Sequence, residues 1–596
     1  MDQHQATSPS TPLREQLRPL FPYLRRYRRG ILVGMACLVT GNVIWMTFPL
    51  ILGRAIDSLT SGTTTAQLLL FAAALVIIAL VKGVFLFLQR WILIGISRDI
   101  EFDLRNDLFQ RLEMQSARFY STWRVGDLMS RSTNDMNAVR MMVGPAAMYT
   151  ANSLAVFPLA IAAMLYLDWG LTLMLLLPVP LVSLVVKRFG RLIHERFERI
   201  QAKMSDLTAR IQENIAGVRL LRAFTQEKAE LRSFGRLNQE YIEANRRLIR
   251  IQGMFFPAIE TLVTVSFLAV LWLGGLAVLG QPVLGRPISL GDFVAFMQYM
   301  FLLTWPMIAL GWVVNIFERG TASLKRLNQL LAAQPDVVDR PAPDAPTEIR
   351  GEIEFRHLNF SYNGVPVLRD INLHIPIGTT LAIVGPTGSG KSTLIQLIGR
   401  LYDAPEGTVL VDGRPTEQHR LATLRRSIGY VPQETFLFSE TLRENIALGT
   451  PQATDQEVEE AAKTADLAGD IEGFPRKYAT RVGERGITLS GGQKQRTAIA
   501  RAVLRNPRIL VLDDALSSVD THTEEKILRR LTTVMRERTS IIISHRVSTV
   551  RHADQIVVLQ DGSIVERGTH EELLARDGYY YDLYQKQLLE EELERT

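Results

Sequence analysis

Long runs of apolar residues dominate the first half of the chain. Six segments are apolar enough to cross a bilayer core of ~30 Å, which takes about 20 helical residues. They are residues 31–52, 68–94, 145–167, 171–186, 255–279 and 293–314. The fourth is short and contains Pro178 and Pro180, so adjoining residues must complete it. Buried core helices are the alternative explanation, but six such runs in succession favour a membrane domain.

Basic residues are distributed unevenly around these segments. Arginines are dense in residues 25–29 and in the long connections 97–141 and 187–254, whereas the other connections are short. Because lysine and arginine are retained on the cytoplasmic side, both termini are predicted to be cytoplasmic. Residues 13–29 are predicted to form a short amphipathic elbow helix on that membrane face, with a frayed basic tail as the alternative.

The pattern changes near residue 334. Residues 334–350 are polar and rich in proline, which is typical of a linker. Beyond them, short apolar strands alternate with helical patterns, as in an α/β domain. We therefore divide the chain into a tail and elbow helix (1–30), an α-helical transmembrane domain (31–333), a linker (334–350) and an α/β domain (351–596).

Composition narrows the possible functions. Cys37 is the only cysteine, which excludes disulfides within the chain and Cys-rich metal sites. The net charge of +6 is explained by membrane topology. The basic residues are not gathered with exposed aromatic residues, so no nucleic-acid partner is expected.

A glycine-rich stretch at the start of the second half has the pattern of a phosphate-binding loop. It follows an apolar strand at residues 380–384 and precedes a helical run at 393–398. Glycine backbone N–H groups and the helix N-terminus favour an anion, Lys391 can reach the β- and γ-phosphates of ATP, and the Ser392 hydroxyl can ligate Mg²⁺. The predicted nucleotide-binding residues here are Gly385, Pro386, Thr387, Gly388, Ser389, Gly390, Lys391, Ser392 and Thr393.

Two further motifs follow. Asp513 ends a second apolar strand at residues 508–513, where an aspartate can hold Mg²⁺. Ser490, Gly491, Gly492 and Gln493 precede a helical run at 494–504, so they form a second predicted anion site at a helix start. A helix cap is the plainer explanation of each motif taken alone.

Together these motifs resemble the ATP-binding cassette (ABC) of a transporter. The pentapeptide 489–493 is similar to the ABC signature, which in that family closes on ATP held by the partner's phosphate loop. The resemblance implies that Tyr362 stacks on adenine, that Gln433 senses Mg²⁺ and the attacking water, and that His545 contacts the γ-phosphate. It also matches residues 517–520 to a dimer-interface loop and residues 482–486 to a loop that touches the membrane domain.

The membrane half resembles the exporter type of ABC transporter. In that type the helices extend into the cytoplasm and two intracellular loops dock on the nucleotide domains. Residues 119–129 are matched to the first loop region and residues 213–227 to the second. One membrane half and one nucleotide domain make half a transporter, so a second chain is required.

Asp514 departs from the family pattern. The resemblance implies a glutamate at this position as the base that activates water, and aspartate withdraws its carboxylate by roughly 1.5 Å. Residues 512–520 are similar to one subunit of heterodimeric bacterial exporters of the multidrug-resistance-like MdlA type. The resemblance therefore implies a weak site on this chain's own motifs and an intact signature that completes the partner's site. Asp514, Gln433 and His545 are the predicted catalytic residues, and Ser392, Gln433 and Asp513 the predicted Mg²⁺ residues.

The expected function is that of a subunit of an ATP-driven exporter in a bacterial inner membrane. It is expected to move amphipathic drugs, lipids or peptides out of the cytoplasm or inner leaflet. A homodimeric exporter or lipid flippase with two slow sites, and a nucleotide-gated regulatory membrane protein, remain as alternatives. Aromatic residues in the spans either line a cavity or pack between helices and lipid. Lys82 and Glu260 lie inside predicted spans, where a charge is costly unless paired or hydrated.

Overall fold

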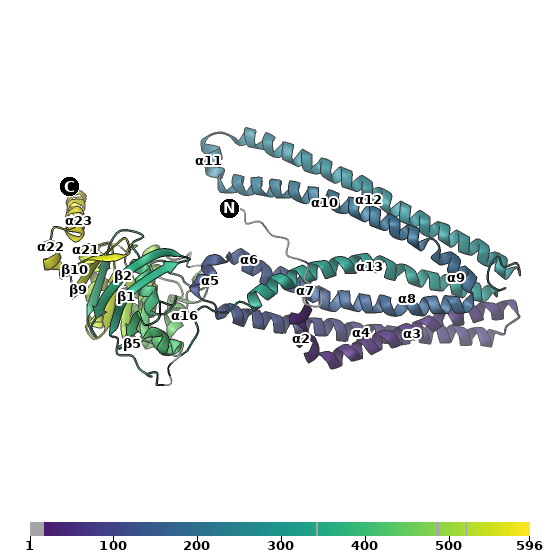
Figure 1. Ribbon diagram of the computed structural model, residues 1–596, viewed down its shortest axis with the longest axis horizontal. Helices are drawn as coiled ribbons and strands as arrows, with labels where there is room; N and C mark the ends of the chain where they lie inside the picture. The colour runs from purple at the N-terminus through teal and green to yellow at the C-terminus, as the bar shows by residue number, and fades with distance from the viewer. Residues whose placement is uncertain are drawn as a thin grey trace. The chain divides into compact units, whose positions relative to one another are not determined.

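The computed structural model describes residues 17–595 except residues 341, 343, 484, 485, 487 and 520. Residues 1–16 of the predicted tail, and Glu484, Arg485 and Asp520 of the predicted loops, lie outside this range. The chain forms two compact units. A membrane unit takes Met1–Phe109 and Met129–Ala332, and a nucleotide unit takes Gln110–Leu128 and Ala333–Thr596 (Figure 1).

The membrane unit is helical. After α2 (Phe21–Arg26), its helices are α3 (Arg28–Thr60), α4 (Thr65–Glu113), α7 (Met136–Met141), α8 (Ala147–Leu167), α9 (Trp169–Leu176), α10 (Val179–Ala216), α11 (Val218–Ala223), α12 (Glu227–Val278) and α13 (Leu290–Leu331). The last residues of α4 and the first of α6 (Val125–Ser130) belong to the nucleotide unit. Within the described residues, six helical stretches of 33 to 52 residues are long and apolar enough to cross a membrane. The predicted six-span class is thereby confirmed.

Proline explains two irregularities in these spans. Pro178 separates α9 from α10, and the helix then continues to Ala216, so adjoining residues do complete the short fourth segment. Pro145 lies in a π-helical turn, Met142–Ala146, between α7 and α8. A proline cannot donate the backbone hydrogen bond of a regular helix, so each break falls where a bond is missing.

The bundle core lies between α3, α8 and α13. Phe296 and Tyr299 are fully buried there, and the Tyr299 hydroxyl donates a hydrogen bond of 2.5 Å to the Met46 carbonyl on α3. These two aromatic side chains therefore pack between helices. Two other aromatic residues of the predicted spans, Trp45 and Trp305, border a cavity.

Three short connections meet at one end of the bundle. The carboxylate of Asp168, between α8 and α9, accepts hydrogen bonds from the backbone N–H groups of Leu171 and Arg286. The carboxylate of Asp57, near the end of α3, accepts from the Ser289 hydroxyl and the Gly291 N–H at the start of α13. The connections that the arginine distribution assigned to one membrane face thus lie together.

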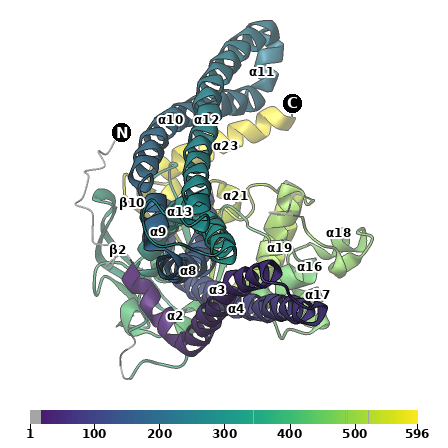
Figure 2. The same cartoon turned by 90° about the vertical axis from the view of Figure 1, so that its right-hand side faces the viewer.

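α10, α11 and α12 form a hairpin arm with α11 at its tip (Figures 1 and 2). Lys203 on α10 pairs with Glu240 on α12 at 2.6 Å, and Arg210 pairs with Glu230 at 2.5 Å. Large apolar side chains of the arm nevertheless stay exposed. They include Ile215 at 70% exposure, Phe224 at 67% and Leu231 at 70%.

The nucleotide unit contains two sheets. The antiparallel sheet has the order β2-β1-β4-β5, and the larger sheet has the order β10-β9-β3-β8-β7-β6. The strands are β1 (Ile353–Tyr362), β2 (Val365–Ile375), β3 (Thr380–Val384), β4 (Val409–Val411), β5 (Arg414–Pro415), β6 (Ile428–Val431), β7 (Ile509–Asp513), β8 (Thr539–Ile543), β9 (Gln555–Gln560) and β10 (Ser563–Gly568). The predicted α/β class is confirmed.

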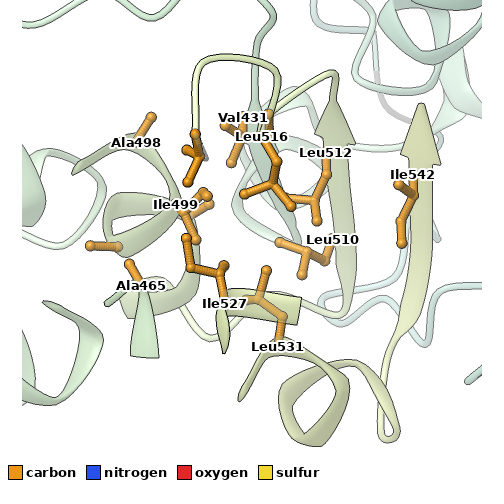
Figure 3. Close-up of a cluster of buried hydrophobic side chains, with 14 of the residues drawn as sticks. Val431, Ala465, Ala498, Ile499, Leu510, Leu512, Leu516, Ile527, Leu531 and Ile542 are labelled. Atoms are coloured by element: carbon orange, nitrogen blue, oxygen red, sulfur yellow. The ribbon is translucent and has the colours of Figure 1, made fainter. Parts of the chain in front are cut away.

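Helices cover the larger sheet. They are α14 (Lys391–Ile398), α15 (Leu421–Arg426), α16 (Leu442–Ile446), α17 (Asp455–Thr464), α18 (Ala468–Glu472), α19 (Gly491–Leu504), α20 (Thr521–Met535), α21 (Val547–Val550), α22 (His570–Leu574) and α23 (Tyr579–Arg595). Leu510 and Leu512 on β7 pack against Ile499 of α19 and Ile527 of α20 (Figure 3). A strand that is buried on both faces has a continuous run of apolar residues. The strands before the phosphate loop and before Asp514 could therefore be predicted from the sequence.

Candidate nucleotide-binding site

Four neighbouring parallel strands end at one edge of the larger sheet. β3 pairs in parallel with β8, β8 with β7, and β7 with β6. The glycine-rich loop follows β3, His545 follows β8, Asp513 ends β7 and Gln433 follows β6. Carboxyl ends of parallel strands are the usual ligand edge of an open α/β sheet. Four of the sequence predictions therefore meet at this edge.

The glycine-rich loop depends on two glycines. Gly390 has a φ of 101° at the N-terminus of α14, and an added Cβ would lie 2.8 Å from the Leu368 side chain. Gly385 has a φ of 150°, and an added Cβ would lie 2.1 Å from the Leu559 carbonyl oxygen. Larger residues would therefore displace the neighbouring strands or the loop.

The Lys391 side chain closes over this loop. It is only 7% exposed, and its Nζ donates hydrogen bonds of 2.8 Å to the carbonyls of both Gly385 and Pro386. Burial lowers the pKa of Lys391, and the carboxylates of Asp513 and Asp514 act in the opposite direction. A buried ammonium held at the loop is suited to contact phosphate as a point charge.

Hard oxygen ligands converge beside the loop. The Ser392 hydroxyl donates to Asp513 at 3.1 Å, and the Tyr430 hydroxyl lies 3.5 Å from the other Asp513 oxygen. Burial raises the pKa of Asp513, and burial together with Asp513 raises the pKa of Tyr430 to about 12. In the described part of the chain, no group of three or more His, Cys, Asp or Glu side chains could hold a metal alone. Ser392 and Asp513 fit Mg²⁺, because that ion is usually held by one or two side chains plus substrate phosphates.

Asp514 has an unusual backbone. Its φ is 48°, in the left-handed region that aspartate and asparagine tolerate better than other non-glycine residues. Its N–H donates to the Ile543 carbonyl at 2.9 Å, and its carbonyl accepts from the Ser517 hydroxyl at 3.0 Å. The backbone is thus fixed directly after Asp513, while the Asp514 side chain is partly exposed at the sheet edge.

Tyr362 reaches the same region from the antiparallel sheet. Its hydroxyl lies 3.4 Å from the Thr393 hydroxyl on α14, and its ring meets Tyr402 edge to face at 5.0 Å. The next residue, Asn363, accepts a hydrogen bond of 3.0 Å from Arg118 on α5 (Ala117–Thr122). The residue directly before the predicted first loop region, 119–129, therefore contacts the turn that follows the predicted adenine-stacking residue.

The signature residues lie at the N-terminus of α19 and not at the sheet edge that carries the phosphate loop. The Ser490 hydroxyl accepts from the Gln493 N–H at 3.2 Å, and the Gln493 side chain accepts from the Ser490 N–H at 3.0 Å, so the two residues form a capping box for α19. Gly491 and Gly492 lie against Ser518. All five residues of the pentapeptide 489–493 are described, and none of them makes a hydrogen bond to the phosphate loop.

The contacts of three residues, Gln495, Gln587 and Tyr430, were not predicted from the sequence. Gln495 on α19 donates to the Ser517 hydroxyl at 3.0 Å, which ties the signature helix to the loop after Asp514. Gln587 on α23 donates to the His545 carbonyl at 2.5 Å and accepts from the Val547 N–H at 2.7 Å. Tyr430 contacts Asp513. Tyr430 lies three residues before Gln433, which the sequence did single out, but no local pattern marks Gln495 or Gln587.

Comparisons with known proteins fit this geometry. Family models match the transmembrane region of ABC transporters at residues 31–307 and the ABC transporter nucleotide domain at residues 368–517. The chain is 38% identical over 580 residues to the probable multidrug resistance ABC transporter ATP-binding/permease protein YheI of Bacillus subtilis, covering 96% of this chain and 98% of that one. It belongs to the ABC exporter family.

Other proteins that are similar to this chain are also ABC transporters. This chain is 39% identical over 579 residues to the multidrug resistance-like ATP-binding protein MdlA of Escherichia coli, covering 96% of both chains. It is 36% identical over 561 residues to the ATP-dependent lipid A-core flippase of Syntrophus aciditrophicus, covering 94% of this chain and 92% of that one. A solved bacterial Atm1-family ABC exporter with ATP bound superposes with a TM-score of 0.77 at 29% identity, covering 94% and 98%. The exporter is therefore a multi-pass half-transporter and an ATP-hydrolysing transport enzyme.

Proposed function

We propose that this exporter subunit moves amphipathic small molecules, such as drugs, lipids or peptides, out of the cytoplasm or the inner leaflet. One observation carries the proposal: a single chain contains both six apolar helices and a predicted nucleotide site. That site lies at the sheet edge where the phosphate loop, Asp513, Gln433 and His545 follow neighbouring parallel strands. Names of two relatives, a multidrug resistance protein and a lipid A-core flippase, support this range of substrates.

The nucleotide roles are assigned as follows. Tyr362 stacks on adenine, and Lys391 with the backbone of residues 385–393 binds the phosphates. Ser392 and Asp513 hold Mg²⁺, with Gln433 nearby, and a bound Mg²⁺ would neutralise charge on the phosphate oxygens. His545 contacts the γ-phosphate. The 3.1 Å contact between Ser392 and Asp513 supports the metal assignment.

We further propose that the partner is a different half-transporter, which supplies a glutamate where this chain has Asp514. A carboxylate shorter by roughly 1.5 Å is poorly placed to activate water, and the left-handed backbone at Asp514 suits aspartate. Signature residues 490–493 then complete the partner's competent site. The exposed apolar side chains of the α10–α12 arm also favour a second chain.

In the proposed orientation both termini and the nucleotide unit are cytoplasmic, in a bacterial inner membrane. The test is cysteine labelling in a Cys37→Ala background. Trp169, the first residue of α9, and Gln281, in the connection before α13, are exposed. Asp168 is only 2% exposed and is hydrogen-bonded, so it is unsuitable for labelling. Trp169→Cys and Gln281→Cys should react with an impermeant maleimide in intact cells. Labelling only after lysis would reverse the orientation.

The main experiment is recovery of the tagged chain from its own cells, followed by reconstitution in liposomes. A second half-transporter should co-purify in equal amount, and the pair should accumulate an amphipathic dye in the lumen only with ATP and Mg²⁺. ATP hydrolysis without any transported probe would favour a regulatory membrane protein. The chosen dyes would have to span cationic, neutral and anionic classes.

A homodimeric exporter or lipid flippase is the second candidate. The retention of His545 and Lys391 beside Asp514 favours it, because the site then keeps every other predicted group. In that case the tagged chain should recover only untagged copies of itself, and each site should hydrolyse ATP slowly.

A further inference from the structure

Inside the membrane unit, a cavity of about 290 Å³ lies between α3, α4, α8 and α13. We propose that it binds the charged group of an amphipathic anion, a phosphate or carboxylate joined to an apolar body. This inference rests on the proposed export function, since it names the substrate class that such a subunit would recognise. The polar residues that border the cavity are Asn42, Lys82, Gln89, Arg90 and Asn152.

Lys82 is the central group. Its Nζ donates a hydrogen bond of 2.8 Å to the Asn42 side-chain oxygen, and the Asn42 amide nitrogen donates at 3.0 Å to Asn152. This chain of amides holds the ammonium in position but does not neutralise its charge. Glu260, the other ionisable residue inside the predicted spans, makes no ion pair with Lys82. In the described part of the chain, no carboxylate lies within salt-bridge distance of Lys82.

An isolated cation is costly in a membrane segment, and such residues usually face an aqueous cavity or a ligand. Arg90 adds a second positive charge to the wall. None of the described residues that border the cavity is acidic. The wall therefore attracts an anion and repels a cation, and the bound anion would supply the missing countercharge.

Gln89 gives an independent indication of a ligand. It lies two helical turns after Lys82 on α4, so both side chains share one helix face. The residue is only 4% exposed, and its Oε1 has no hydrogen-bond partner. A buried amide oxygen without a partner is unfavourable. An anion cannot donate to Oε1. Rotation of the terminal amide by 180° puts Nε2 in the position of Oε1, however, and Nε2 can donate to an anion.

Aromatic side chains complete the wall. Trp45, Tyr149 and Trp305 border the cavity beside the polar group. Trp305 is 61% exposed, so this side of the wall is accessible to an apolar group. The volume is at the small end of ligand pockets, which run from about 300 to 1,000 Å³. It suits a headgroup and the start of an apolar chain rather than a whole lipid.

The test measures equilibrium binding to the complete exporter complex in nanodiscs of phosphatidylcholine. The probe is radiolabelled dodecyl phosphate, and dodecylamine and dodecanol are the competitors with the same chain length. Dodecyl phosphate should bind saturably, and neither competitor should displace it at equal concentration. Equal binding of the amine and the phosphate would overturn the proposal.

Variants at Lys82 connect the binding to the cavity. Lys82→Met should weaken dodecyl phosphate binding by about 10- to 100-fold, the usual contribution of a hydrogen bond between charged groups. Lys82→Arg should retain binding, Lys82→Glu should prefer dodecylamine, and Gln89→Leu should weaken phosphate binding by a smaller factor. Lys187→Met, at an exposed lysine outside the cavity, is the matched control and should bind as wild type does. Unchanged affinity in both Lys82→Met and Lys82→Glu would refute the site.

Two further arms separate the possible outcomes. Phosphatidylglycerol added to the discs should displace the probe if bilayer lipids reach the cavity, and should not if only soluble amphipathic anions do. If Lys82→Met fails to assemble, the comparison of Lys82→Arg with Gln89→Leu still decides the matter, and equal wild-type affinity in both would refute the site. A complex that binds the anion selectively but shows no ATP-dependent transport would refute the export proposal alone. A complex that transports with ATP but binds anion and cation alike would refute the cavity proposal alone.

Discussion

The phosphate-loop end and the signature end of the nucleotide unit differ in the burial and in the hydrogen-bond partners of their key residues. At the phosphate-loop end, Lys391 and Asp513 are buried and bonded to groups of the same sheet edge. At the signature end, Ser490 and Gly491 are exposed, and the hydrogen bonds described for Ser490 go to Gln493 and Lys494 of the helix that it caps. The first end is organised within one chain, whereas the second presents a helix N-terminus toward solvent. The residues of the phosphate-loop end are thus held in place by their own chain, whereas those of the signature end remain open to contact from outside.

The largest expected effect comes from breaking the exposed end. Ser490→Arg puts bulk and positive charge where the signature would close on the partner's ATP, although it touches no catalytic base. Steady-state ATP hydrolysis of the purified pair should fall by about 100-fold or more, as when a transition-state donor is removed. Thr533→Arg, at an exposed position on α20, is the control and should hydrolyse normally. Wild-type turnover in Ser490→Arg would mean that the two ends do not work across chains.

The buried end is tested by nucleotide occupancy. Lys391→Ala removes a cationic phosphate contact and should weaken ATP binding at this chain's own loop by about 10- to 100-fold. The measurement is photolabelling of this chain with an azido-ATP analogue while the partner's site is blocked. Lys463→Ala, an exposed lysine at the end of α17, is the matched control. Equal labelling of the two variants would contradict the assignment of the phosphate loop.

A smaller effect is expected at Asp514, which distinguishes a weak site from a working one. If the short carboxylate is misplaced by about 1 Å, the site is already slowed by roughly 100-fold, so Asp514→Asn should lower total hydrolysis by less than about twofold. Asp514→Glu should raise hydrolysis at this site, although the φ of 48° disfavours glutamate. Single-turnover hydrolysis with the partner's site disabled measures both. If Asp514→Asn abolishes activity in a dimer of this chain alone, Asp514 is a working base and the asymmetric pairing is wrong.

Local sequence pattern was enough to predict some elements of the fold and of the site, but not the contacts between distant segments. The strands that end at the phosphate loop and at Asp513 are short apolar runs followed at once by chemically distinctive residues, so local pattern was enough to place them. The six spans were equally visible because they are long and apolar. The contacts of Gln587 with the segment at His545, and the burial of Asp168, depend on which distant segments meet. The partner of Lys82 is likewise forty residues away, on another helix.

The smallest expected effect concerns the contact between α23 and the segment after β8. Gln587 accepts from the Val547 N–H and donates to the His545 carbonyl, so it steadies the predicted γ-phosphate contact from outside the motifs. Gln587→Ala removes these neutral hydrogen bonds, worth about 1 kcal/mol each. Amide exchange in the peptide 541–550 should accelerate several-fold by mass spectrometry, because local opening becomes easier.

Steady-state hydrolysis of the Gln587→Ala pair should change little, because His545 belongs to the weak site in the proposed arrangement. Lys586→Ala, at an exposed neighbour on α23, should alter neither measurement. A large loss of turnover in Gln587→Ala with unchanged assembly would place His545 in the site that limits the cycle. The phosphate-loop end of this chain would then carry catalysis as well as binding, and the difference between the two ends would be one of exposure only.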